Sequence, residues 1–477
     1  MDCLLLILMT NVIFVSPLSN EVLFVEKYQS APPTNTYADC VQHELLIAEA
    51  QNLSLHEVRK VCNNLFIEQT QLWSKTMRED PDVANYVGHL LRGVHAGIER
   101  QKKRKKRSIF SSDVYTRKEV REPPYDENWG AYAKAVRRLK NTYDIRPDMS
   151  NYDVIAHLHT ADGVIPTAHD GPGFFAWHRE YLKIMEIALG CPIPYWDTTL
   201  DEAMDDPSES CVWSDKYFGN KYGLVTTGIM KKLQSWIPII RNVNSYGWLI
   251  SRDDVTMALS KPTLYEFTEK TPCDEANRTR YSWECFHKGI HDWIDGTIAP
   301  SNTTTFDPIF FPIHAYIDKI FELFRQQLIS KGINPEDNYP VKNILNHEPN
   351  HTTIWVPIYP NIEHLTNSQC YGDDLAGLTK YSISPACPYC YGSDDLYCDH
   401  ERNICVSRKV TTEDKYVKAV ISVPTADGGI QLINTMVLDV PERTKELIQR
   451  TGPLPFGRKF KAGSPDPRTR NDSIPEL

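Results

Sequence analysis

Apolar residues recur at helical spacing through the central part of the chain, where five segments place them three and four positions apart. These predicted helices cover residues 129–144, 150–160, 176–190, 283–296 and 306–332. Ser150 or Asn151 is placed to cap the second helix, and Gly190 to end the third. Asp307 and Pro308 form a natural N-cap and first-turn pair for the fifth. We therefore predict a mainly α-helical protein with long ordered loops between the helices.

The pattern changes beyond residue 365. Residues 366–410 are a small cysteine-rich module, because five cysteines fall within 36 residues, a density typical of disulfide-stapled modules. Residues 411–477 contain two β-prone runs around an Asp427–Gly428 turn, which predicts a C-terminal β-hairpin, and then a tail of low hydrophobicity. The five cysteines are Cys370, Cys387, Cys390, Cys398 and Cys405.

The first residues, MDCLLLILMTNVIFVSPLS, have a short apolar core followed by small residues and a proline. This pattern predicts a secretory signal peptide over residues 1–19, and the alternative is a buried N-terminal helix. No later run reaches the roughly 18 to 20 apolar residues of a membrane span. We therefore expect a soluble protein that is secreted or held in secretory vesicles.

Two further features agree with the secretory route. Eleven cysteines remain after the signal peptide, an odd number that leaves one thiol free or paired between chains. Five N-x-S/T sequons are candidate glycosylation sites, because such sites receive sugar only in that route. The acceptor residues are Asn52, Asn277, Asn302, Asn350 and Asn471.

A run of six Lys and Arg residues at 102–107 is the clearest boundary along the chain. Behind a signal peptide, Arg104 and Arg107 predict cleavage by a proprotein convertase before Ser108, and the alternative is a heparin-like or membrane-surface patch. Residues 20–107 would then be a helical pro-region, and 108–365 the main domain. Cys40 and Cys62 could staple two helices of the pro-region.

Composition narrows the class of function. The 477 residues are 41% hydrophobic and 24% charged, as in ordinary globular proteins. The net charge of −10 argues against nucleic acid as the main partner, since that would call for a basic face.

Six histidines have spacings that suggest a metal site. His287 and His291 are four apart, so on a helix both rings leave the same face and can hold one metal. His169 and His178 bracket a turn rich in glycine and aromatic residues, so their rings can converge. His159 on the preceding helix and His314 on the last helix complete two sets of three.

The donor set indicates which metal to expect. Neither set includes a carboxylate or thiolate, and the HExxH signature of many zinc hydrolases is absent. Imidazole-only sites favour copper, which stands at the top of the divalent affinity series. Two copper sites facing each other can bind one dioxygen molecule between them.

The segments YDVIAHLHTADGVIPTAHDGPGFFAWHREYL and HKGIHDW with FDPIFFPIHAYIDKIFELF resemble the two copper-binding signatures of the tyrosinase and molluscan-haemocyanin superfamily. The resemblance covers roughly residues 114–365. It implies a four-helix bundle that holds a type 3 dicopper centre, with O2 as co-substrate. It further implies that His159, His169 and His178 bind one copper, and that His287, His291 and His314 bind the other. His157 matches no ligand position.

The resemblance also implies roles for residues around the ligands. Arg179 and Asp318 would form an ion pair that ties two copper helices together; the alternative is two solvated charges. Glu284 would hold a water that takes the proton of a phenol; the alternative is a carboxylate on the helix surface.

Three positions depart from the family pattern. Lys288 stands where many relatives have Asn, which puts monophenol oxidation in doubt. Thr167 replaces a cysteine that in many relatives is bonded to a histidine ring. Ile313 replaces the first member of a His–His pair, while His314 keeps the ligand position.

Similarity to a secreted animal tyrosinase implies a phenol oxidase that ortho-hydroxylates monophenols or oxidises o-diphenols to o-quinones, and the basic run at 102–107 further predicts that it is made as a zymogen. Its substrates would be small phenols or tyrosyl and DOPA groups, some of them in proteins, and its products would serve melanin formation or the tanning of cuticle, shell or eggshell. The pro-region or the C-terminal module would cover the site before cleavage. The alternatives are a catechol oxidase without monophenolase activity, a haemocyanin-like oxygen carrier, and an interaction protein with a degenerate copper site.

Overall fold

The computed structural model describes residues 80–105, 115–160, 164–268, 283–340, 347–353, 365–410, 421–424 and 430–433. By the density of internal contacts the chain divides into two units, Met1–Leu65 and Phe66–Leu477, and all described residues belong to the second. The predicted signal peptide, the Cys40–Cys62 pair, the cut after Arg107 and the predicted tail lie outside the described residues.

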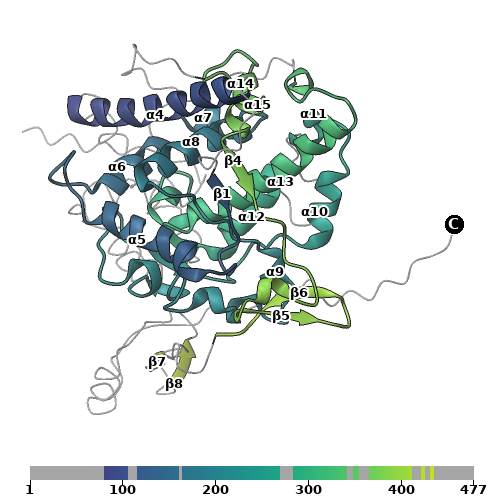
Figure 1. Cartoon of the computed structure of the whole chain (residues 1–477). Coiled ribbons are helices and arrows are strands. Elements are labelled where there is room, and N and C mark those ends of the chain that lie inside the picture. The colour runs from purple at the N-terminus through teal and green to yellow at the C-terminus, as the bar shows by residue number, and fades with distance from the viewer. Residues whose placement is uncertain are drawn as a thin grey trace, which may run out of the picture. The chain divides into compact units, whose positions relative to one another are not determined.

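The described residues are mainly helical, as the sequence predicts (Figure 1). With the labels of Figure 1, the α-helices are α4 (Pro81–Lys105), α5 (Trp129–Lys140), α6 (Asn151–His157), α7 (Ile165–Ala168), α8 (Gly173–Leu189), α9 (Thr199–Glu202), α10 (Arg252–Leu259), α11 (Leu264–Thr268), α12 (Trp283–Ile294), α13 (Phe310–Ser330), α14 (Asn367–Tyr371) and α15 (Asp373–Ala376). Among these helices, none is both long and apolar enough to cross a bilayer.

The strands that the structure describes are short and form pairs. Strand β1 (Tyr115–Arg117) is parallel to β4 (Thr379–Tyr381), although more than 260 residues separate them. The antiparallel pairs are β2 (Tyr222–Leu224) with β3 (Ile240–Asn242), β5 (Leu396–Asp399) with β6 (Ile404–Ser407), and β7 (Ile421–Pro424) with β8 (Ile430–Ile433). The last pair is the predicted C-terminal hairpin, with Ile421 opposite Ile433.

The five predicted helices are all present, and two of their predicted ends are confirmed. Ser150 caps α6, since its hydroxyl accepts the Asp153 N–H. Gly190 ends α8 with a φ of 72°, a left-handed conformation that glycine adopts at little cost. The prediction for Asp307 and Pro308 is wrong by two residues, because α13 begins at Phe310 with Ile309 as its N-cap. Asp307 accepts the Ile309 N–H ahead of that helix, and its carboxylate is held by a buried ion pair with Arg241.

Four helices surround the candidate site. The hydroxyl of Tyr181 on α8 donates to the Ile155 carbonyl of α6 at 2.9 Å. The indole N–H of Trp283 on α12 donates to the Ile317 carbonyl of α13 at 3.2 Å. Both contacts are buried, so they fix the relative rotation of neighbouring helices as well as their separation. The predicted helical bundle is therefore confirmed, with α6, α8, α12 and α13 as the helices that position the histidines.

Helix α4 packs along α8 and belongs to the same unit. Its buried residues include Val87, Leu91 and Val94, which recur at helical spacing and form one apolar face. A Cβ built at Gly93 would lie 2.9 Å from the Ile187 side chain, so glycine allows the two helices to approach closely. The last part of the predicted pro-region is thus an integral part of the core of the main domain.

The cysteine-rich module carries two disulfides, Cys387–Cys398 and Cys390–Cys405, which pack with Leu200 in one apolar cluster. Cys370 is a buried free thiol, and so it does not staple the module. Free thiols are also found at Cys191 and Cys211 among the described residues.

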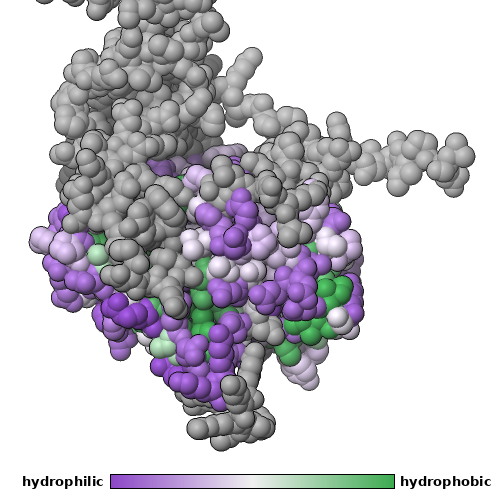
Figure 2. All heavy atoms as spheres, turned by 90° about the horizontal axis from the view of Figure 1, so that it is seen from above, coloured by the Kyte–Doolittle hydropathy of each residue, from purple (hydrophilic) through white to green (hydrophobic). Residues whose placement is uncertain are grey.

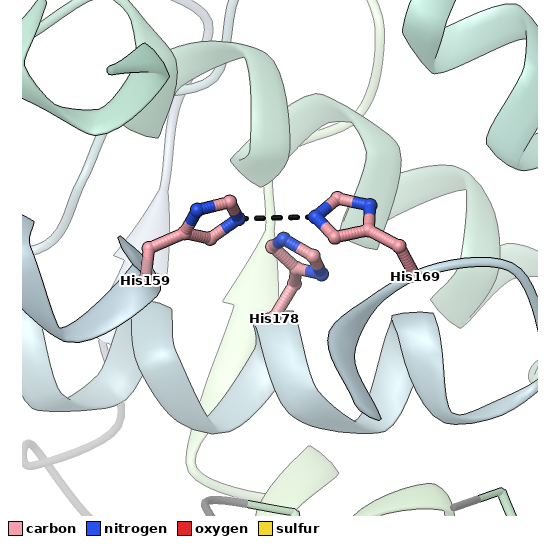
Figure 3. Close-up of side chains that lie close together, drawn as sticks. All are labelled: His159, His169 and His178. Atoms are coloured by element: carbon pink, nitrogen blue, oxygen red, sulfur yellow. Dashed lines mark hydrogen bonds between the residues drawn. The ribbon is translucent and has the colours of Figure 1, made fainter. Parts of the chain in front are cut away.

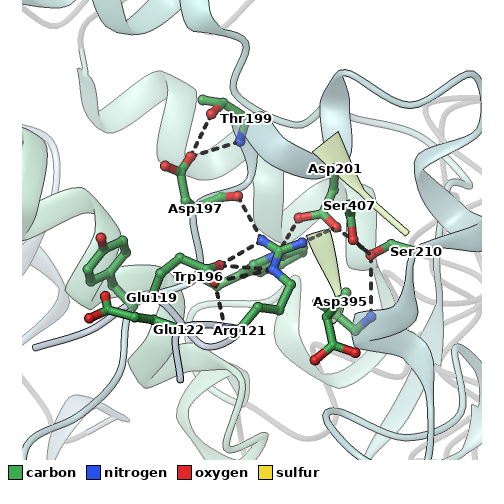
Figure 4. A network of polar contacts seen from close by, with 12 residues as sticks. Glu119, Arg121, Glu122, Trp196, Asp197, Thr199, Asp201, Ser210, Asp395 and Ser407 are labelled. Atoms are coloured by element: carbon green, nitrogen blue, oxygen red, sulfur yellow. Dashed lines mark hydrogen bonds and ion pairs between the residues drawn. The ribbon is translucent and has the colours of Figure 1, made fainter. Parts of the chain in front are cut away.

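A buried polar network fixes the cysteine-rich module to the main domain (Figure 4). Arg121 pairs with Glu119 at 2.6 Å and with Asp201 at 2.9 Å. Ser210 donates to Asp201 and lies 2.9 Å from the Ser407 hydroxyl of β6. Because these groups are buried, each charge is stabilised by its ion-pair and hydrogen-bond partners instead of by water. The network therefore fixes the module to the main domain.

The surface on the α4 side of the described residues is mostly hydrophilic and has separate apolar patches (Figure 2).

Two predicted glycosylation sites can be compared. Asn350 is exposed, whereas the Nδ2 atom of Asn302, which would carry the sugar, is buried. Asn350 is therefore the better acceptor of the two. Asn52, Asn277 and Asn471 lie outside the described residues.

Candidate metal centre

The first three histidines come from three consecutive elements. His159 lies in the 3₁₀ turn Leu158–Thr160 that extends α6, His169 follows the end of α7, and His178 lies on α8. Asp170 has a φ of 69°, which turns the chain directly after His169. Figure 3 shows the rings of His159 and His169 facing each other above His178, with their Nε2 atoms 3.1 Å apart.

The second three come from two helices. His287 and His291 lie one turn apart on α12, as their spacing predicts, and His314 lies on α13. The Nε2 atoms of His287 and His314 are 2.9 Å apart. Within each triad, the ligand nitrogens lie within 4.8 Å of one another, close enough to bind a single metal ion.

The two triads face each other. The rings of His178 and His314 are stacked, with centroids 4.3 Å apart and planes within 18°. Aromatic rings back this arrangement, since Phe310 stacks on His314 at 3.9 Å and Phe174 lies 4.5 Å from His178. The resulting site has two adjacent three-nitrogen sets enclosed by an apolar wall.

Backbone carbonyls orient three of the six rings. The Nδ1 atom of His159 lies 3.0 Å from the Ser301 carbonyl, and that of His291 lies 2.9 Å from the Ile298 carbonyl. Likewise, the Nδ1 atom of His178 lies 2.8 Å from the Phe174 carbonyl. A carbonyl only accepts, so Nδ1 carries the proton and Nε2 keeps its lone pair free for a metal.

The residues present fit a metal ion. The Nε2 atoms of His178 and His291 are buried and have no hydrogen-bond partner among the described residues. A buried polar atom without a partner is costly, and a metal ion between the three nitrogens of each triad would remove that cost. Imidazole donors suit copper, zinc, iron and nickel, and copper stands at the top of the divalent affinity series.

Burial keeps five of these imidazoles neutral. It lowers the pKa of His291 to about 4, and the neighbouring His169 ring acts in the same direction. The pKa values of His159, His178, His287 and His314 are held well below the ordinary range, first by burial and then by the other rings of the cluster. Neutral imidazole is the form that binds metal, so the site is ready to bind at neutral pH.

Comparison with known proteins agrees with this geometry. The family model for the common central domain of tyrosinase matches residues 149–327, which include all six histidines. Residues 149–327 form a tyrosinase domain of the type 3 copper superfamily. "Tyrosinase-like protein 1" of Margaritifera margaritifera is 28% identical over 394 residues, 77% of this chain and 75% of that protein.

Two other matches extend the comparison. The "Tyrosinase-like protein" of Pinctada maxima is 29% identical over 355 residues, 68% of this chain and 73% of that protein. A functional unit of octopus haemocyanin is a solved structure with 18% identity, a TM-score of 0.37, and coverage of 57% of this chain and 68% of that one.

The ion pair predicted behind the triads of the tyrosinase domain is present and is part of a larger network. Arg179 Nε lies 2.6 Å from Asp318 Oδ1. Asp318 also accepts from Arg117 of β1 at 3.1 Å and from the Tyr381 hydroxyl of β4, and Arg117 pairs with Glu186 at 2.7 Å. Sequence reasoning missed Arg117, Glu186 and Tyr381. Arg117 and Tyr381 lie outside residues 149–327, and only a β-prone run around Tyr115 could have pointed to a paired strand there.

Glu284 makes a contact that its spacing did not suggest. Its Oε1 accepts the Asp170 N–H at 2.7 Å and lies 3.4 Å from Nδ1 of His169. It therefore connects α12 to the loop that carries a ligand of the other triad. The water-holding role stays a prediction.

The three departures from the family pattern, and His157, can be placed in the structure. The Lys288 side chain is 57% exposed and pairs with Asp292, one turn along the outer face of α12. Thr167 is buried and donates to the Val164 carbonyl, while His157 packs against Trp236. Ile313 is buried on α13.

The tyrosinase domain without metal is expected to lose stability as pH falls from about 6.5 to about 4. An unfolded histidine takes up a proton near pH 6.5, whereas burial lowers the pKa of folded His291 and His157 to about 4. The unfolded chain therefore binds more protons in this window, and each such histidine lowers stability by up to about 1.4 kcal/mol per pH unit. Burial raises the pKa of Glu119 and Glu180 to about 7, which acts in the opposite direction, but burial also lowers the pKa of His159, His178, His287 and His314, so the histidines outnumber these two carboxyls.

The measurement is the thermal midpoint of chelator-treated protein between pH 7.5 and 4.5. His157→Asn serves as the matched variant, because it removes one titrating ring and is expected to flatten the profile. A midpoint that stays constant through this range would contradict the prediction.

Proposed function

We propose that the chain is a copper-dependent phenol oxidase that uses O2 to ortho-hydroxylate monophenols, to oxidise o-diphenols to o-quinones, or to do both. The observation that carries the proposal is the pair of facing triads, each complete and each made of imidazoles alone. The match of residues 149–327 to the tyrosinase domain supports the proposal. The matching proteins, which come from organisms as different as a mollusc and a dog, are named tyrosinase or tyrosinase-like.

The residues of the chain would divide the work as follows. His159, His169 and His178 would hold one copper, and His287, His291 and His314 the other. The metal pair, when bound, would supply the activation of dioxygen. The protein contributes orientation and exclusion of water: carbonyl contacts fix the rings, and buried aromatic side chains keep the surroundings apolar. Glu284 Oε1 would hold the proton on Nδ1 of His169, 3.4 Å away.

Oxygen uptake by the copper-loaded full chain tests the proposal. We expect uptake with an o-diphenol, and monophenol uptake in addition if the protein is a complete tyrosinase. Diphenol uptake alone would identify a catechol oxidase. Reversible oxygen binding, seen as an oxygen-dependent change of absorption without turnover of either phenol, would overturn the enzyme proposal in favour of a carrier.

Lys288→Asn addresses the balance between the two substrate classes. If Lys288 limits monophenol oxidation, the variant is expected to raise the monophenol rate severalfold while the diphenol rate stays the same. The side chain points to the outer face of α12, so an indirect effect through Asp292 is the route to examine. Asp292→Asn is the matched variant, and unchanged rates in both would remove this pair from consideration.

We also propose that the protein is secreted as a zymogen cut after Arg107, with melanin formation or protein tanning as its role. The apolar start and the basic run at 102–107 support this proposal. Helix α4 contacts α8 at Ile187, nine residues or about 13 Å along the axis from His178. Activation would therefore not depend on removing α4 itself.

Cleavage after Arg107 is expected to leave α4 bound to the rest of the protein. Its apolar face is buried against α8, and ion pairs join Asp80 to Arg146 at 2.9 Å and Lys102 to Asp374 at 2.9 Å. The cut protein should elute as one species from a native sizing column and separate into two fragments on a reducing denaturing gel. Leu91→Asp on the buried face should release the fragment, whereas Ala96→Asp on the exposed face should not. A wild-type fragment that elutes alone would contradict the prediction.

A further inference from the structure

His169 is the least enclosed of the six candidate ligands. Its side chain is 18% exposed, while the residues of the other five are buried. It also lies in a loop after the four-residue helix α7, whereas His178, His287, His291 and His314 lie on longer helices. Something other than helix packing must therefore set the position of its ring.

The loop 169–173 is held from one side by a histidine outside the two triads. His347 Nδ1 accepts the Gly173 N–H at 3.0 Å, and this contact is buried. His347 is 2% exposed and comes from the segment 347–353, which lies beyond the matched tyrosinase domain. Burial lowers the pKa of His347, although the Glu284 carboxylate and backbone groups of His169 and Pro166 act in the opposite direction.

The glycines of this loop fit the His347 ring. A Cβ built at Gly171 would lie 2.8 Å from His347 Cγ, and one at Gly173 would lie 2.6 Å from His347 Nδ1. Real Cβ atoms do not approach other atoms so closely, so both positions require glycine as long as the ring stays in place. The DGPG sequence is thus explained by close packing on an imidazole.

His347 is itself fixed from behind. The Tyr339 hydroxyl donates to the His347 carbonyl at 2.9 Å, and the Asn367 side chain donates to the next carbonyl, that of Glu348, at 3.2 Å. The same segment reaches α8, since the Thr353 hydroxyl donates to Glu180. A ring held in this way can act as a rigid stop for the loop.

We propose that His347 is a positioning residue that, together with Glu284, fixes the loop 169–173 and so places His169 in the first triad. The inference rests on the proposed function, in that the task of the loop is to present a copper ligand. Glu284 holds the Asp170 N–H from α12, and His347 holds the Gly173 N–H from the opposite end of the loop. With Thr167 unable to form a cysteine cross-link, these two acceptors hold the loop without a covalent bond.

Loss of the acceptor would act on the metal site through the loop. Replacing His347 by an apolar side chain leaves the buried Gly173 N–H without a partner, which favours movement of the loop toward water. His169 then no longer presents its Nε2 at a fixed place. Removal of groups that orient a ligand typically weakens metal binding about 10- to 100-fold.

The test measures copper per chain in a chelator titration of purified full-length protein, alongside thermal unfolding without metal. Wild type is expected to hold two equivalents. His347→Leu should lose one equivalent at a chelator concentration about 10- to 100-fold lower than wild type. His347→Asn should restore retention, because asparagine Oδ1 stands at the position of Nδ1 and can accept the Gly173 N–H. His351→Leu, on the same segment, is the matched control and should behave as wild type.

Each result decides a different point. Two equivalents held by His347→Leu with wild-type resistance would overturn the inference and leave the proposed function standing. Failure of His347→Asn to restore retention would also overturn it, because a structural role alone would then explain the loss. A wild-type chain that binds no copper would overturn the proposed function instead. If His347→Leu does not fold, Gly171→Ala decides: loss of one equivalent supports the inference, and retention of both contradicts it.

Discussion

Replacing His291 by asparagine is expected to abolish phenol oxidation and to reduce bound copper from two equivalents to one. His291 Nε2 is buried without a partner among the described residues and lies in the second triad, and the shorter asparagine cannot reach the same place. A reaction that needs both metal ions should then slow by at least about three orders of magnitude. Metal analysis and oxygen uptake on the same sample measure the two effects together.

His157→Asn is the matched control for this change. His157 is equally buried and lies two residues from a candidate ligand, yet it packs against Trp236 instead of joining a triad. It should keep both copper ions and most of the activity. Full activity and two equivalents of copper in His291→Asn would contradict the assignment of the second triad.

Replacing Asp318 by asparagine is expected to lower the free energy of unfolding by about 3–5 kcal/mol. The carboxylate accepts from both Arg179 and Arg117 in a buried network, and the arginines cannot lose their charge. The variant would leave two buried guanidinium groups with one carboxylate fewer to offset their charges, since Arg117 would keep only Glu186 and Arg179 only Glu322 as ion-pair partners. Denaturant unfolding of metal-free protein measures the change without a contribution from copper.

Asp374→Asn is the comparison for Asp318→Asn. Asp374 pairs with Lys102 at 2.9 Å on the surface, where an ion pair contributes about 1 kcal/mol or less. A similar small loss in both variants would show that the buried network contributes little to stability.

The helices could be predicted from the sequence because each one buries one face. A buried helix face requires apolar residues three and four positions apart, and this spacing can be seen in the sequence. The local caps at Ser150 and Gly190 were predictable for the same reason, since the signal lies within a few residues. The start of α13 could not be predicted from such a local signal. Asp307 has the sequence of a cap and its carboxylate accepts the Ile309 N–H, but a buried ion pair with Arg241, 66 residues earlier, holds it ahead of the observed N-cap, Ile309.

The residues of the candidate site also differ in how far they could be predicted from the sequence. Spacing brought His287 and His291 together, and resemblance to a family supplied the full set of six. His347 and the Glu284 contact could not be predicted, because they join positions 174 and 114 residues apart with no periodic signal. Glu284 was predicted to hold a water that takes the proton of a phenol, and the structure shows in addition that it contacts the loop of the other triad from the first turn of α12.

The predicted domain limits stay predictions, and the described contacts cross two of them. Helix α4 lies before the limit at 107 and packs on α8, and β4 lies beyond the limit at 365 but its Tyr381 hydroxyl donates to Asp318 of α13. The predicted limits follow from changes in composition, namely a basic run and a cysteine-rich segment. The limits of a folded core depend instead on which segments pack against each other, and composition does not show this. A fragment covering 108–365 alone would lack Tyr381 and the apolar face of α4.

The parallel pairing of β1 with β4 has a consequence for the order of folding. Tyr115 pairs with Thr379, so this contact cannot form until the intervening chain, with every helix that carries a candidate ligand, has been synthesised. Closing so long a loop is slow compared with forming local helices. Arg117 and Tyr381 therefore reach Asp318 late, after the helices behind the histidines have formed.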